Sequence, residues 1–287
     1  MTTGRAASVH ARLVALARAR GTDPNRLLER YAIERWLYRL SVSKHRESLC
    51  LKGALLFDLW FDAAHRPTRD ADFLGFGSPE ASELESLVSA VCAVAADDGL
   101  SFDLESLEIS EIREDARYGG LRVKLKAQLG TGRIPMQLDV GYGDAVTPGI
   151  EEAAFPTLFG DSPPPRLKVY PRATVVAEKL EAIASLGVPN SRMKDYFDLF
   201  ALAHEGKLDV PVLADAVWAT FRRRGTPLPS GLPVGLTVAF AENADKLTLW
   251  NAFLRKSGLE GPSLGVVVTK LGTFLEEPLQ RARRRTP

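Results

Sequence analysis

Apolar residues at intervals of three and four positions predict two helices at the start of the chain. The first covers residues 6–20 and ends at Gly21. The second begins after Asp23, a residue type that caps helices, and has Pro24 in its first turn. We expect these N-terminal helices, within residues 1–48, to pack on the core that follows.

Between residues 49 and 170, the apolar pattern takes the period of two that is typical of strands. In residues 121–129, apolar side chains alternate with charged or polar ones, and Gly130-Thr131-Gly132 then turns the chain into a second strand at 134–140. This pair predicts a β-hairpin. Further strands are predicted at 72–77, 102–112 and 166–170.

After these strands, helical spacing returns and continues to the end of the chain. Helices are predicted at 173–186, 194–204, 212–223, 239–256 and 264–284. The order of the elements predicts a bilobed α+β protein. Its mixed β-sheet core, flanked by helices, would occupy residues 49–170, and its C-terminal helical lobe residues 171–287.

The composition is that of a soluble globular protein. The 287 residues are 45% hydrophobic and 25% charged, with a net charge of +1, so nucleic-acid binding would need a local basic patch. Two cysteines are too few for a disulfide framework. No apolar stretch reaches the ~18 residues of a membrane helix, and the N-terminus lacks a secretion signal. We therefore expect a cytoplasmic protein without a membrane partner.

Aspartates on the predicted strands are candidates for a metal site. Asp70 and Asp72 occupy alternate positions, so their side chains point the same way. Like charges this close repel each other, and a cation between them relieves the repulsion. Asp139, on the second strand of the hairpin, would add a third carboxylate if its strand is adjacent, although it could also be an ordinary strand acid. Such oxygen ligands suit Mg²⁺ with bound nucleotide phosphates.

Residues close to the acid pair could contact a nucleotide. Gly53, in the turn Lys52-Gly53-Ala54, could let a phosphate approach the backbone. Thr68 and Arg69 stand just before the acids and could touch a triphosphate. Glycine turns are common, however, and Thr68 and Arg69 could equally serve a local turn.

A second charged cluster lies in the predicted helical lobe. Lys179 is on a largely apolar helix, and the next helix begins with Asp195 and Asp198, one turn apart on nearly the same face. A lysine and an acid from neighbouring helices would suit triphosphate binding. The alternatives are a solvated lysine and acids favoured by the helix dipole.

Arginines form two runs toward the C-terminus, Arg222–Arg224 and Arg281–Arg285. Further basic residues lie near the presumed cleft: Arg166, Lys168, Arg172, Arg192 and Lys194. Such groups are more often solvated than used for binding, but several aligned around the cleft would form a phosphate track for an RNA end. The histidines lack metal-ligand spacing, and the chain has no P-loop, dinucleotide fingerprint or nucleophile elbow.

The ordered set of motifs resembles that of the AbiEii/AbiGii-type (MenT-like) nucleotidyltransferase toxins. The motifs are Lys52-Gly53-Ala54-Leu55-Leu56, Arg66-x-Thr68-x-Asp70-x-Asp72, Asp139, Glu178-Lys179-Leu180 and Arg192-x-Lys194-Asp195-x-x-Asp198-Leu199. The resemblance spans residues 49–200. One departure is Ala54-Leu55, where the family pattern often has a second glycine and a small hydroxyl residue.

The resemblance implies a nucleotidyltransferase-like fold and a toxin of a bacterial toxin–antitoxin or phage-defence system, with a cognate antitoxin. Such enzymes bind a nucleoside triphosphate and Mg²⁺, and several transfer nucleotides to the 3′ acceptor end of tRNA, which blocks translation. By this resemblance, the metal ligands would be Asp70, Asp72 and Asp139. The nucleotide contacts would be Thr68, Arg69 and Lys179, with Gly53 beside them, and the catalytic residues Asp70, Asp72, Lys179 and the essential acid Asp195.

Two other hypotheses stay open. The low net charge also suits an adenylyltransferase that modifies a small molecule such as an antibiotic, which would confer resistance rather than growth arrest. A non-catalytic nucleotide-binding regulatory protein is less favoured, because a site that has lost its catalytic function need not retain the acids and the lysine together.

Overall fold

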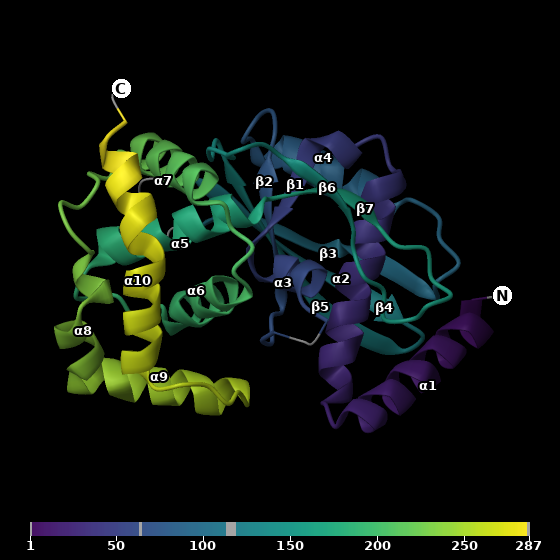
Figure 1. Ribbon diagram of the computed structural model, residues 1–287. Coiled ribbons are helices and arrows are strands. Elements are labelled where there is room, and N and C mark those ends of the chain that lie inside the picture. The colour runs from purple at the N-terminus through teal and green to yellow at the C-terminus, as the bar shows by residue number, and fades with distance from the viewer. Residues whose placement is uncertain (1, 63–64, 113–118, 286–287) are drawn as a thin grey trace. The chain divides into compact units, whose positions relative to one another are not determined.

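The computed structural model describes residues 2–62, 65–112 and 119–285, and the chain divides into two compact units (Figure 1). The first comprises Met1–Gly143 and Glu151–Val169, and the second comprises Asp144–Ile150 and Tyr170–Pro287. The N-terminal helices therefore belong to the same unit as the sheet. The short segment between the hairpin and the next strand belongs to the helical unit.

A seven-stranded sheet forms the centre of the first unit, in the order β3-β4-β5-β2-β1-β7-β6. The strands are β1 Leu49–Lys52, β2 Asp70–Gly75, β3 Leu100–Ile112, β4 Gly120–Leu129, β5 Gly132–Tyr142, β6 Glu151–Ala154 and β7 Arg166–Val169. β2 runs parallel to β5 and antiparallel to β1, and β4 and β5 form the predicted hairpin. The mixed sheet expected from the sequence is confirmed. β6 was not predicted, because its mostly exposed side chains show no apolar alternation.

Helices cover one face of this sheet. α1 (Thr2–Arg20), α2 (Pro24–Val42) and α4 (Ala81–Cys92) contact β4, β5 and β3, respectively. In β4 the apolar residues are buried at alternate positions, whereas Lys124 and Lys126 between them are exposed. The turns η1 (Arg46–Ser48) and η2 (Gly53–Leu56) flank β1, and the short helix α3 (Phe57–Trp60) follows. The second face of the sheet therefore carries the polar side chains.

Helix α2 also buries charged residues that its apolar spacing does not reveal. Arg35 and Arg39 are each 2% exposed, and Asp98 is 5% exposed. Arg39 donates to the two carboxylate oxygens of Asp98 at 2.6 and 3.0 Å, and Arg35 donates at 3.3 Å. The carboxylate of Glu34, which is fully buried, accepts from the N–H of Leu158 at 2.7 Å. These bonds fix α2 to loops that are distant in the sequence.

Replacing Glu34 with glutamine is expected to remove a pH-dependent loss of stability. Burial raises the pKa of Glu34 above its ordinary value of 4.5, although the Leu158 N–H and the charges of Arg30 and Arg35 act in the opposite direction. A raised pKa contributes stability below the ordinary value, and this contribution is lost as the pH rises through the folded-state value. The Tm of Glu34→Gln relative to the wild type should therefore increase between about pH 4 and about pH 7. Thermal unfolding at the two pH values tests this, and a constant or decreasing difference contradicts it.

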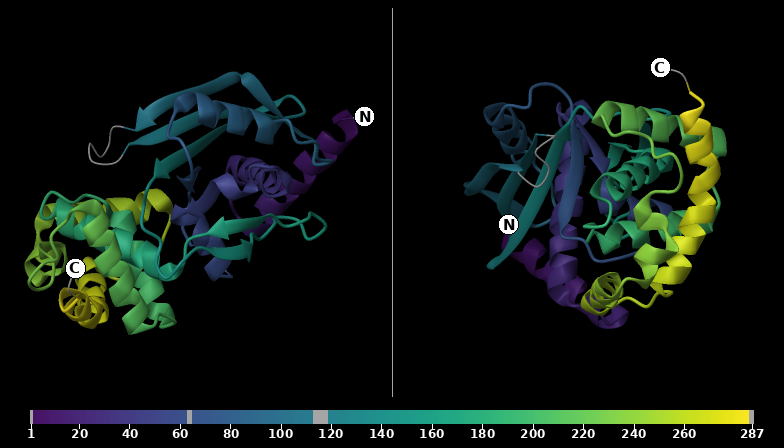
Figure 2. Two further views of the ribbon diagram at one scale, coloured as in Figure 1. Left: turned by 90° about the horizontal axis from the view of Figure 1, so that it is seen from above. Right: turned by 90° about the vertical axis from the view of Figure 1, so that its left-hand side faces the viewer.

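The second unit is built from helices. They are α5 Arg172–Leu186, α6 Met193–Glu205, α7 Val210–Arg224, η3 Val234–Leu236, α8 Val238–Glu242, α9 Ala244–Ser257 and α10 Leu264–Arg283. α10, the yellow helix in Figures 1 and 2, packs against α6, α7 and α8. The single helix predicted at 239–256 is wrong, because Asn243 interrupts it and caps α9 by accepting from the N–H groups of Asp245 and Lys246. None of the helices within residues 2–62, 65–112 and 119–285 combines the length and the apolar character that a membrane span requires.

Candidate active site

The aspartates predicted as metal ligands lie on one face of two neighbouring strands. Asp70 and Asp72 are at alternate positions of β2, and Asp72 is in register with Asp139 of the parallel strand β5. Residues in register on adjacent strands project from the same face of a sheet. All three are half-buried. In the part of the chain that the structure describes, no group of three or more His, Cys, Asp or Glu side chains is arranged to hold a metal ion.

Asp139 is held by an arginine that was not among the predicted site residues. Arg122 of β4 donates through Nε to Oδ1 at 2.9 Å and through Nη2 to Oδ2 at 2.7 Å. The amide nitrogen of Gln137 lies 3.2 Å from Oδ1. Paired arginine–carboxylate bonds of this kind are strong and fix the orientation of both groups. Asp139 could therefore join a metal site only by giving up some of these bonds.

The hairpin itself contains the signal that would have identified Arg122. Leu129 and Gly132 pair across the two-residue turn at Gly130 and Thr131. Counting seven residues outward along each strand from that pair places Arg122 opposite Asp139. Opposite charges in direct register across two strands attract each other. The ion pair could thus have been predicted from the turn and the strand period.

Gly53 lies directly against Asp72. Lys52 of β1 is in register with Asp72 of β2, and η2 begins at Gly53, whose φ is 73°. A Cβ atom at this position would clash with Oδ2 of Asp72. Both the positive φ and this close approach require glycine. The backbone at Gly53 therefore packs against a carboxylate, and its contact with a phosphate stays a prediction.

Thr68 and Arg69 make local contacts in this structure. The Thr68 hydroxyl donates to the backbone carbonyl of Asp70 at 3.4 Å. The Arg69 side chain is 74% exposed, and its Nε lies 3.4 Å from Oε2 of Glu29 on α2. The Thr68 bond is typical of turn chemistry. A triphosphate contact by either residue stays a prediction.

The donor chemistry of the aspartates fits Mg²⁺. This cation prefers oxygen ligands, and it usually takes one or two protein carboxylates together with water and substrate phosphates. Asp70 and Asp72 supply two carboxylates from one face of β2. Asp139 would be a third ligand if Arg122 released it.

In the helical unit, Lys179 of α5 lies between two buried acids of α6. Its Nζ is 2.7 Å from Oδ1 of Asp195 and 2.8 Å from Oδ2 of Asp198, whose side chains are 1% and 0% exposed. Arg192 donates to the second oxygen of Asp195 at 2.6 Å. Burial by itself raises the pKa of Asp195, but the charges of Lys179 and Arg192 outweigh burial and lower that pKa below its ordinary value. The alternative of a solvated lysine is wrong, since the Lys179 side chain is 14% exposed.

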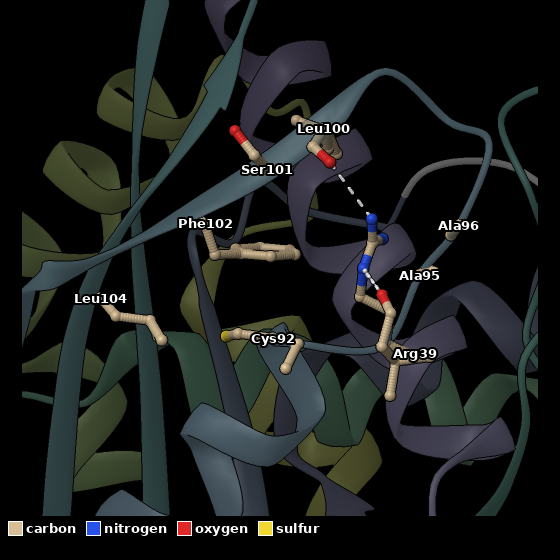
Figure 3. A pocket seen from close by; sticks show the side chains of 10 residues that line it. Arg39, Cys92, Ala95, Ala96, Leu100, Ser101, Phe102 and Leu104 are labelled. Atoms are coloured by element: carbon tan, nitrogen blue, oxygen red, sulfur yellow. Dashed lines mark hydrogen bonds between the residues drawn. The ribbon is translucent and has the colours of Figure 1, made fainter. Parts of the chain in front are cut away.

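A cavity of about 350 Å³ lies elsewhere in the first unit (Figure 3). Its lining includes Arg39, Cys92, Val94, Leu100, Phe102 and Leu104. Arg39 donates to the backbone carbonyls of Val94 and Leu100 beside it. Burial raises the pKa of the Cys92 thiol to about 11, so the reactive thiolate is scarce at neutral pH. None of the predicted site residues lines this cavity, and it is not a candidate active site.

Comparisons with known proteins identify the family of the chain. The family model described as the nucleotidyl transferase AbiEii toxin of type IV toxin–antitoxin systems matches residues 35–277. The crystal structure of JHP933 from Helicobacter pylori is similar, with 14% identity and a TM-score of 0.51 over 91% of this chain and 95% of that chain. A protein from H. pylori described as a candidate nucleotidyltransferase has 15% identity and a TM-score of 0.49 over 91% and 98% of the two chains. No curated protein is similar enough in sequence to count as a match.

The likeness to JHP933 shows the fold alone, because the identity is low. The family match is of a different kind. It covers most of the chain and includes the strand aspartates as well as Lys179 and Asp195. The chain therefore belongs to the AbiEii family of nucleotidyltransferase toxins from type IV toxin–antitoxin systems.

Proposed function

We propose that this nucleotidyltransferase moves a nucleotide from a nucleoside triphosphate to the 3′ acceptor end of tRNA, in an Mg²⁺-dependent reaction that blocks translation. The observation that carries the proposal is the register of Asp72 with Asp139, with Asp70 on the same face. Carboxylates gathered from two strands suit a cation that serves phosphoryl chemistry. Family membership supports the class of reaction and the role as a toxin.

Asp70 and Asp72 would hold Mg²⁺, and Asp139 would become the third ligand if Arg122 released it. When bound, the cation would neutralise charge on the triphosphate and on the departing pyrophosphate. Arg122 compensates the charge of Asp139 and holds its carboxylate in one orientation through two bonds. Gly53 leaves room for the Asp72 carboxylate where any side chain would displace it. The protein thus orders the anionic face before a nucleotide arrives.

The other predicted contacts have proposed roles with the nucleotide. Lys179 would contact the triphosphate, Asp195 would be the essential acid, and Thr68 and Arg69 would be further phosphate contacts. An ammonium has three donor hydrogens. A phosphate would therefore add to, or exchange with, the bonds that Lys179 makes to its two acids.

The partner and the location follow from the same proposal. A type IV toxin–antitoxin family supports a cognate antitoxin as a partner of this protein. A tRNA target would place the protein in the cytoplasm, where tRNA is aminoacylated.

Incubation of the purified chain with total tRNA and each α-labelled nucleoside triphosphate tests the proposal. Label should move to the 3′ end of tRNA with at least one of the nucleotides, stop when EDTA is added and resume with excess Mg²⁺. A tRNA whose terminal ribose has been oxidised by periodate is the control and should stay unlabelled. Absence of transfer from any nucleotide by the folded protein contradicts the proposal. Transfer to an added aminoglycoside instead would identify a small-molecule adenylyltransferase.

A further inference from the structure

The first unit contains arginine–aspartate pairs that differ in burial. Arg39 and Asp98 share two bonds, and only 3% and 6% of their side chains are exposed. Arg122 and Asp139 also share two bonds, but 28% and 16% of their side chains are exposed. Breaking a buried pair leaves uncompensated charges in the interior, whereas water can solvate the partners of a half-exposed pair. Arg122 and Asp139 can therefore exchange partners more readily than Arg39 and Asp98.

The half-exposed pair lies in one row with the proposed metal site. Asp72 of β2, Asp139 of β5 and Arg122 of β4 are in register across three neighbouring strands. Both carboxylate oxygens of Asp139 accept from Arg122, on the side away from Asp72. Over the residues that the structure describes, no three acidic, histidine or cysteine side chains are placed to hold an ion. This is the arrangement expected if Arg122 withholds Asp139 from a cation.

A phosphate is the partner that could take Arg122 from Asp139. A guanidinium group donates two parallel bonds to a phosphate as it does to a carboxylate. Two strand spacings, about 10 Å, separate β4 from β2, so Arg122 is near any phosphate that binds beside Asp72. The amide nitrogen of Gln137 lies 3.2 Å from Oδ1 of Asp139 and would still orient this carboxylate after the exchange.

We propose that Arg122 is a positioning residue that withholds Asp139 from the divalent cation until a nucleotide phosphate binds its guanidinium group. This inference rests on the proposed function. Without a nucleotide, Asp70 and Asp72 alone hold the cation. With a nucleotide, Asp139 becomes the third ligand, so phosphate binding and completion of the metal site are coupled.

Binding of Mn²⁺ to the nucleotide-free protein, measured by electron paramagnetic resonance, tests the first part. Asp139→Asn should leave the Kd for Mn²⁺ within about twofold of the wild type, because Asp139 is not yet a ligand. Arg122→Met should tighten this Kd roughly tenfold, and Arg122→Met/Asp139→Asn should lose the gain. The control Lys124→Met removes an exposed cation that is opposite Gln137 and two strands from Asp70. It should change the Kd by no more than about twofold, because water and salt screen this charge.

Binding of inorganic triphosphate at saturating Mg²⁺, measured by calorimetry, tests the second part. Arg122→Met should weaken the Kd for triphosphate about fivefold or more, because two charge-assisted bonds are lost. Lys124→Met should again stay within about twofold of the wild type. If Arg122 only withheld Asp139, its removal would leave triphosphate binding unchanged or tighter. Circular dichroism verifies that all variants are folded.

The outcomes separate this inference from the proposed function. Equal effects of Arg122→Met and Lys124→Met, including none in either, overturn the inference. Clearly weaker binding of Mn²⁺ by Asp139→Asn also overturns it, because Asp139 would already be a ligand, and so does unchanged or tighter binding of triphosphate by Arg122→Met. These results leave the proposed function intact when the wild type labels tRNA. A wild type that neither binds Mn²⁺ nor labels tRNA overturns both.

Discussion

Replacing Asp72 with asparagine is expected to reduce nucleotide transfer by roughly a thousandfold or more, because metal-assisted charge stabilisation is worth several kcal/mol. The amide keeps the shape of the side chain and removes the negative charge that would hold Mg²⁺. Asp72 is in register with Asp139 and packs against Gly53. Its carboxylate therefore has a fixed place on the face of the sheet that carries Asp70, Asp72 and Asp139, which we call the acid face. Transfer of labelled nucleotide to tRNA measures the loss.

A matched control separates this loss from a general effect of removing an acid. Glu108→Gln takes an exposed carboxylate from β3 of the same sheet, and transfer should stay within about twofold of the wild type. Circular dichroism should show that Asp72→Asn is folded, so that the loss of transfer reports the missing negative charge. A folded Asp72→Asn protein with the wild-type rate of transfer would refute the role of the acid face.

The acid face could be predicted because strand geometry converts sequence spacing into position. Alternate residues of one strand share a face, which placed Asp70 beside Asp72. The register of β5 beside β2 then decided the position of Asp139. The sequence suggested that the strand of Asp139 lies beside that of Asp72. It could not establish this pairing, because parallel strands are joined through long connections. The outward count from a two-residue turn was the one further step available, and it leads to Arg122.

The features that escaped prediction depend on contacts between distant residues. Nothing in the sequence of α2 indicates that Asp98 neutralises Arg39, because only tertiary packing brings the two side chains together. The break at Asn243 reflects a local capping bond that competes with a continuous apolar pattern. The ion pair between Arg285, just after α10, and Asp215 of α7 likewise depends on how the two helices pack. The spacing of apolar residues along the chain indicates the type of each element and its apolar face. It does not indicate which elements pack against each other.

Replacing Lys179 with methionine is expected to destabilise the helical unit by about 3–5 kcal/mol at neutral pH. Methionine keeps a long apolar stem and a good helix propensity. It removes the charge that lies 2.7 and 2.8 Å from the carboxylates of Asp195 and Asp198, both almost fully buried. Arg192 remains against Asp195, so this carboxylate keeps one of its two cations. Calorimetry should record the change as a drop of several degrees in Tm.

The pH dependence of this loss distinguishes buried charge from lost packing. In the wild type, the lowered pKa of Asp195 contributes stability that is lost as the pH falls through the folded-state value. In Lys179→Met, burial still raises the pKa of Asp195 while one of the two cations that lower it is gone. Protonation of this carboxylate should therefore cost the variant less stability than the wild type as the pH falls toward about 4. The deficit relative to the wild type should therefore shrink in acid. Lys179→Met/Asp198→Asn should regain part of the loss at neutral pH.

Lys246→Met supplies the comparison that decides between these causes. Lys246 is 7% exposed and donates to the backbone carbonyl of Asn190 at 2.9 Å, so its removal leaves a neutral group behind. That variant should lose only about 1–2 kcal/mol, with little dependence on pH. Equal deficits in the two lysine variants, or a Lys179→Met deficit that is constant with pH, would mean that packing sets the stability of this cluster. A larger, acid-sensitive deficit at Lys179 would mean that its charge is what keeps two carboxylates ionised inside the helical unit.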